Sequence, residues 1–67
     1  MTHVKSRAIS DIIYRKETQT LYVFFTDHSA YAYHGVPEYV YNEMKTAESV
    51  GMYYNLNVRN SYTYNSY

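Results

Sequence analysis

The sequence contains no cysteine and no tryptophan, and it has one proline and two glycines among its 67 residues. Without cysteine the chain cannot form a disulfide, and no Cys–His spacing of a structural zinc site is present. A chain of this length is one small domain, and folding at that size buries only about 60% of the surface that the unfolded chain exposes. Its stability must come from efficient packing or from a partner subunit.

The sequence also lacks a long hydrophobic run and an excess of charge of one sign. No apolar stretch approaches the ~20 residues of a membrane span, and the start MTHVKSRAIS lacks the apolar centre of a signal peptide. We therefore expect a soluble, cytoplasmic protein. Six basic side chains balance six acidic ones, which argues against non-specific binding of duplex nucleic acid, because that mode needs many phosphate contacts.

Tyrosine is the residue in excess, with eleven copies. Tyrosine is favoured on surfaces that bind a partner and also stay wet. The C-terminal stretch VGMYYNLNVRNSYTYNSY mixes tyrosine with asparagine and serine, so it is either a functional surface or a polar tail.

Two stretches rich in β-branched and aromatic residues flank the polar segment RKETQ and predict two strands joined by a short turn. We place these strands at about residues 8–15 and 20–26. After a predicted hairpin turn at TDHS, the segment AYAYHG alternates and gives a third strand with Tyr31 and Tyr33 on one face. These segments predict a three-stranded antiparallel meander.

The segment from Pro37 to about Glu48 has the spacing of an amphipathic helix, and proline suits a first helical turn. The apolar stripe of this helix consists of Val40, Met44 and Ala47. The stripe should pack on the sheet face formed by Leu21, Val23 and Phe25. The fold class is therefore α+β, with the meander packed against one main helix.

The opposite sheet face carries an aromatic patch of Tyr22 and Phe24, with Tyr14 beside them. Small monomers rarely leave such a patch bare. We therefore expect a homo-oligomer or a ligand surface here, with a fold-over of the C-terminal SYTYNSY segment as the alternative.

Beyond the helix we interpret Gly51 as its terminator, followed by a short C-terminal helical turn anchored by Met52, Leu56 and, less regularly, Val58. Residues 63–67 form a C-terminal tail. That tail is either a frayed end or an added strand that pairs in an oligomer.

Three motifs follow one another at characteristic spacings: Y-x-Y from Tyr31 to Tyr33, V-P-x-x-V-Y from Val36, and G-x-Y-Y/F-N-x-x-[IV]-R from Gly51 to Arg59. Over residues 4–62 the chain resembles the KTSC domain, found at the C-terminus of some lysyl-tRNA synthetases and as small stand-alone proteins of bacteria and phages. The resemblance implies RNA binding, from the context beside a synthetase. One departure is the turn TDHSA, where the family usually has a glycine.

Asn55 and Arg59 are the strongest candidate binding pair, because in a helix they lie four residues apart on one face. A guanidinium and an amide can together bind a phosphate or a base edge. The alternative is that Arg59 pairs with an acidic residue while Asn55 caps a turn. Tyr54, in the same family segment, joins the predicted site.

Tyr31 and Tyr33 can stack on nucleobases, a contact worth about 1–3 kcal/mol. The alternative is that both rings pack under the helix. Ser6 and Arg7, with Lys5, suit a phosphate group, or else they are solvated terminal side chains.

The three histidines, His3, His28 and His34, have no metal-ligand spacing. No nucleophile stands beside a base, and we find neither a glycine-rich phosphate loop nor a carboxylate pair. We expect no enzyme activity, metal or cofactor.

The sequence favours a non-catalytic binding module for RNA or a phosphate-bearing nucleotide. One alternative is a phage-encoded anti-defence protein that sequesters a cyclic oligonucleotide signal, for which a pocket shared between subunits is needed. The other is a structural module that forms a homo-oligomer through the aromatic face.

Overall fold

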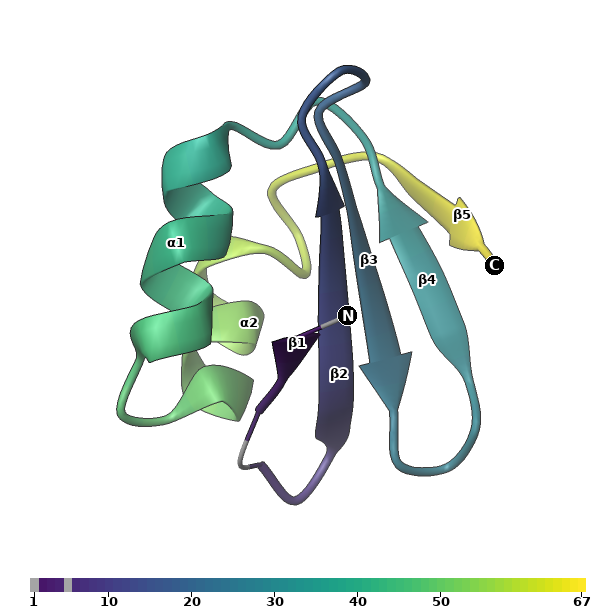
Figure 1. Ribbon diagram of the computed structural model, residues 1–67. Coiled ribbons are helices and arrows are strands. Elements are labelled where there is room, and N and C mark those ends of the chain that lie inside the picture. The colour runs from purple at the N-terminus through teal and green to yellow at the C-terminus, as the bar shows by residue number, and fades with distance from the viewer. Residues whose placement is uncertain (1, 5) are drawn as a thin grey trace.

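The computed structural model describes residues 2–4 and 6–67, which form five strands and two helices. The fold is α+β. Figure 1 shows both helices on one side of the sheet. The elements in chain order are β1 (Thr2–His3), β2 (Ile9–Arg15), β3 (Thr20–Phe25), β4 (Ala30–Tyr33), α1 (Glu38–Thr46), α2 (Val50–Asn57) and β5 (Tyr64–Ser66).

The sheet follows the order of the chain, β1-β2-β3-β4-β5, and every neighbouring pair is antiparallel. Its centre is the predicted three-stranded meander. The edge strand β1, of two residues, was not predicted. The other edge strand, β5, has three residues and lies in the tail for which an added strand was one alternative, but it pairs with β4 of its own chain. Such short segments carry almost no periodic signal. Neither helix in the described part of the chain is long and apolar enough to cross a membrane.

The core lies between the helices and the sheet face that carries Leu21 and Val23, both fully buried. From α1 the core receives Val40 and Met44, as the helical spacing predicts. Apolar residues from β2, the loop after β4 and the α2 segment complete it: Ile9, Ile12, Val36, Val50 and Val58.

The second helix is longer than the predicted turn and has a different buried face. Gly51 lies inside α2 rather than ending α1. Two of the three predicted anchors are wrong, because Met52 is 62% and Leu56 is 73% exposed. The third, Val58, is fully buried, as predicted. Val50, Tyr54 and Val58 make the core contacts, and they recur every four residues and so share one side of a helix.

Both β-hairpin turns place a non-glycine residue at positive φ, Gln19 at 52° and His28 at 72°. In the second turn, the Asp27 side chain stabilises the loop through hydrogen bonds. Its Oδ1 accepts hydrogen bonds from the Ser29 backbone N–H at 3.0 Å and the Ser29 hydroxyl at 2.6 Å. This side-chain turn fits the hairpin without the glycine that the family usually has here.

The C-terminal residues cover the outer sheet face within the same chain. The Tyr67 N–H donates to the Ala30 carbonyl at 2.9 Å, and the Tyr67 ring meets Tyr22 and Phe24 edge-on at 4.8 and 5.9 Å. The Tyr67 ring thus lies over this patch, as the fold-over alternative expects, whereas a homo-oligomer at this face stays a prediction. Tyr14, expected beside this patch, lies on the helix side, where its ring stacks on Tyr41 at 5.4 Å.

Candidate functional site

A cleft of about 510 Å³ opens between the helix side of the sheet and α2 with the residues that follow it. The aromatic residues that line the cleft are Phe25, Tyr31, Tyr33, Tyr54 and Tyr64. Its polar lining consists of Asp27, Ser29, Asn55, Arg59 and Asn60, and Ala8, Ile9 and Gly51 complete it. Among the described residues, the cleft therefore combines ring surfaces with one cation, Arg59, and one carboxylate, Asp27.

Five of the seven residues predicted from the sequence come together in this cleft: Tyr31, Tyr33, Tyr54, Asn55 and Arg59. They derive from β4, α2 and the turn after α2, which are separated along the chain. Their convergence follows from the packing of α2 on the sheet.

Asn55 and Arg59 are exposed at the rim of the cleft. The Arg59 backbone N–H donates to the Tyr54 carbonyl at 2.9 Å, beside the bond from the Val58 N–H to the same oxygen at 3.0 Å, and this fixes the chain just past α2. Within residues 2–4 and 6–67, no hydrogen bond or ion pair engages the side chain of Asn55 or Arg59. Both groups are therefore available to a ligand.

Tyr33 and Tyr54 form the floor of the cleft. Tyr33 is 2% and Tyr54 is 8% exposed, and their hydroxyls share a hydrogen bond. Burial, followed by this bond, raises the pKa of the Tyr33 hydroxyl. The Tyr33 ring contacts the rings of Tyr54 at 5.8 Å and Tyr64 at 5.4 Å, so other parts of the protein cover most of this ring.

Tyr31 and Tyr64 form the wall of the cleft. Tyr31 is half-buried, and its ring meets Phe25 and Tyr64 edge-on at 5.7 and 5.6 Å. Tyr64 is 57% exposed. The wall therefore retains ring surface that a ligand can contact.

Sequence reasoning missed several lining residues, above all Tyr64 and Asp27. Tyr64 is brought into the site by the pairing of β5 with β4, where it lies opposite Tyr33. Asp27 is in the β3–β4 turn, and the hydrogen bonds from Ser29 hold the pKa of its carboxyl below the usual value. The TDHS turn motif could have indicated Asp27, but nothing local could have indicated Tyr64.

Ser6 and Arg7 do not line the cleft. The Ser6 hydroxyl accepts from the backbone N–H groups of Ala8 and Ile9 at 3.3 and 3.4 Å, so it shapes the entry into β2. Arg7 is exposed. Lys5, which was grouped with them, lies outside the described residues.

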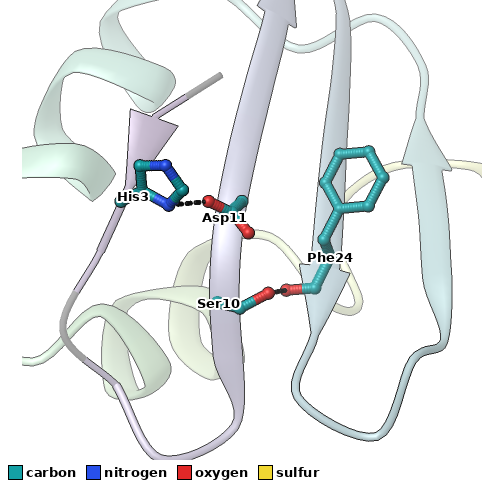
Figure 2. A network of polar contacts seen from close by, with 4 residues as sticks. All are labelled: His3, Ser10, Asp11 and Phe24. Atoms are coloured by element: carbon teal, nitrogen blue, oxygen red, sulfur yellow. Dashed lines mark hydrogen bonds and ion pairs between the residues drawn. The ribbon is translucent and has the colours of Figure 1, made fainter.

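Two of the three histidines, His3 and His34, make side-chain contacts with nearby strands. Figure 2 shows His3 on β1 paired with Asp11 on β2, beside the 3.3 Å bond from the Ser10 hydroxyl to the Phe24 carbonyl. His34 Nε2 contacts the Asn65 side chain. In the described part of the chain, no three His, Cys, Asp or Glu side chains form a group that could hold a metal ion.

The comparisons with known proteins identify the family. The KTSC domain model matches residues 5–62. The crystal structure of a KTSC domain protein from Yersinia pestis superposes with a TM-score of 0.93 at 25% sequence identity, over 97% of this chain and 92% of that chain. No curated protein matches the sequence. The chain belongs to the KTSC domain family.

Proposed function

We propose that this protein is a non-catalytic binding module for RNA or a phosphate-bearing nucleotide. The observation that carries the proposal is the position of the Arg59 guanidinium, which has no ionic partner among the described residues and stands in an aromatic cleft. A guanidinium binds phosphate through paired hydrogen bonds. Rings near that cation suit the base attached to the phosphate.

Each side of the cleft has a role in this proposal. Arg59 binds the phosphate, Asn55 reaches a base or ribose edge, and the wall of Tyr31 and Tyr64 contacts the base. Base–aromatic contacts of this kind are worth about 1–3 kcal/mol and tolerate any base. With a formal net charge of zero, the chain suits a compact ligand or a single-stranded loop better than a long duplex.

Calorimetry and thermal shift against a ligand panel test the proposal. The panel contains the four nucleoside 5′-monophosphates, homopolymeric RNA hexamers, and cyclic di- and trinucleotides. A ligand at a hundredfold excess over its Kd stabilises the fold by about 2.7 kcal/mol, which is readily detected in a small domain. Absence of binding by every member would overturn the proposal.

A related proposal is that the ligand is a cyclic oligonucleotide immune signal, which a phage protein would sequester. This role calls for a pocket shared between subunits. The cyclic members of the panel test it directly. Binding of linear RNA but not of cyclic molecules would exclude it.

The competing proposal is an oligomerisation module that pairs through its aromatic face. Tyr67 covers Tyr22 and Phe24 and is itself 70% exposed, so a ring surface remains for a second copy. Size-exclusion chromatography with light scattering gives the oligomeric state. A monomer at micromolar concentration would exclude this module and also the shared pocket.

A further inference from the structure

The floor of the cleft contains one more hydrogen-bond donor than the protein uses. Tyr33 and Tyr54 each carry one hydroxyl hydrogen, and a single hydrogen bond joins the two oxygens. That bond uses one of the two hydrogens, whichever residue donates. Among the residues that the structure describes, no other acceptor bonds to either hydroxyl.

The spare hydrogen cannot be removed by ionisation at ordinary pH. Burial raises the pKa of Tyr33 above the usual tyrosine value, so this hydroxyl stays a donor. A buried donor without an acceptor is costly. Water can serve as its acceptor in the free protein, and a ligand atom can replace that water.

Both hydroxyls belong to residues that line the cleft below the wall of Tyr31 and Tyr64. The charged groups and the Asn55 amide of the cleft lie nearer to the solvent than the floor does. Arg59, Asn55 and Asp27 are exposed, whereas Tyr33 and Tyr54 are buried. A ligand that fills the cleft therefore meets a neutral donor at the bottom and a cation at the rim.

We propose that the Tyr33–Tyr54 hydroxyl pair donates a hydrogen bond to an acceptor atom on the edge of a nucleobase that enters the cleft base first. This inference rests on the proposed function and deepens it. The base lies against the wall of Tyr31 and Tyr64, a carbonyl oxygen or ring nitrogen on its edge accepts from the floor, and the phosphate stays at Arg59. A phosphate at the floor is disfavoured, because desolvation of the anion there has no cation to offset it.

The first test replaces both floor hydroxyls with hydrogen in the double variant Tyr33→Phe/Tyr54→Phe, which keeps both rings. A single substitution is insufficient, since the remaining hydroxyl can still donate. The matched control is Tyr22→Phe on the outer face, which removes one hydroxyl far from the cleft lining. Affinities are measured for the panel above, with ribose 5-phosphate and an abasic hexamer as phosphate-only references.

The double variant should bind the preferred base-containing ligand about two- to tenfold more weakly, the range expected for one neutral hydrogen bond. Its affinity for the phosphate-only references should not change, and Tyr22→Phe should match the wild type. Unchanged base-containing affinity, or equal loss for the references, would overturn the floor contact and leave the proposed function standing. Failure of the wild type to bind any panel member would overturn both.

A ligand-side test does not depend on how the double variant folds. Thymidine 5′-monophosphate is compared on the wild-type protein with its analogue in which 2,4-difluorotoluene replaces thymine. The analogue keeps the shape and the phosphate but is a very poor acceptor, so it should bind about two- to tenfold more weakly. Equal affinity for the two compounds would overturn the inference.

Discussion

The hydroxyl of Tyr33 on β4 meets the hydroxyl of Tyr54 on α2, so a hydrogen bond joins the sheet to the second helix inside the apolar core. The same contact forms the floor of the cleft. The same two side chains therefore hold α2 on the sheet and line the candidate site, so a substitution at either should affect both the stability of the domain and the shape of the cleft.

Alkaline pH should destabilise the fold through four buried or partly buried tyrosines. The pKa values of Tyr14, Tyr33, Tyr53 and Tyr62 are raised above 10.0, chiefly by burial. Above about pH 10 the unfolded chain loses these protons while the folded chain keeps them, so stability is full below that pH and falls as pH rises. Denaturant unfolding at a series of pH values from neutral to alkaline gives the slope.

The matched variant for this prediction is Tyr33→Phe, which removes one of the groups. Its free energy of unfolding should fall less steeply above about pH 10 than that of the wild type. A stability that does not change between neutral and alkaline pH would contradict the prediction.

The parts of the fold that the sequence predicts are those with a sustained pattern. Alternation in β3 separates Leu21 and Val23 from Tyr22, and helical spacing in α1 brings Val40 and Met44 to the core. In α2 the pattern is weak, because large apolar residues occupy both its exposed and its buried sides. A signal that could have indicated the start of α2 is Ser49, because serine is a preferred residue at a helix N-cap.

Ser49→Ala should destabilise the domain by about 1 kcal/mol. The Ser49 side chain accepts a hydrogen bond from the Met52 backbone N–H at 3.2 Å and caps α2. Thermal or urea unfolding measures the loss. Ser49→Asp should retain most of the wild-type stability, since a carboxylate makes the same cap and interacts favourably with the positive end of the helix dipole. An alanine variant as stable as the wild type would show that the cap contributes nothing.

The candidate site was predictable where its residues lie in elements with a clear sequence pattern. Tyr31 and Tyr33 alternate in a strand. Asn55 and Arg59 were found from their spacing of four residues, although α2 ends at Asn57 and Arg59 lies in the turn that follows. The position of Tyr64 in the site could not be predicted from the sequence, because it depends on the register of a three-residue edge strand against β4. Such pairing is decided by long-range packing and not by the local pattern.

Tyr67→Ala should cost about 1 kcal/mol, because the ring makes edge contacts with Tyr22 and Phe24. Tyr67→Phe keeps the ring and should retain the stability of the wild type. Urea unfolding of the three proteins compares them. If alanine and phenylalanine behave alike, the C-terminal ring does not stabilise the outer face.

His28→Gly should stabilise the domain by about 0.5–1 kcal/mol. His28 has a φ of 72°, a conformation that costs side-chain-bearing residues about 1–2 kcal/mol and glycine almost nothing, although glycine loses more chain entropy on folding. His28→Ala keeps the backbone strain and is the control. Glycine and alanine variants of equal stability would contradict the prediction.

Arg59→Ala should weaken binding of phosphate-bearing ligands about tenfold to a hundredfold, the loss expected for a charged hydrogen-bonding group. The fold should be unaffected within about 0.5 kcal/mol, because the side chain is exposed and only the Arg59 backbone bonds to α2. Arg7→Ala is the matched control, as it removes an exposed cation outside the cleft lining. Calorimetry and thermal unfolding separate the two effects. Equal losses of affinity in both variants would mean that net charge, and not the position of Arg59, attracts the ligand. Unfolding of the Arg59 variant would mean that this side chain is needed for the fold.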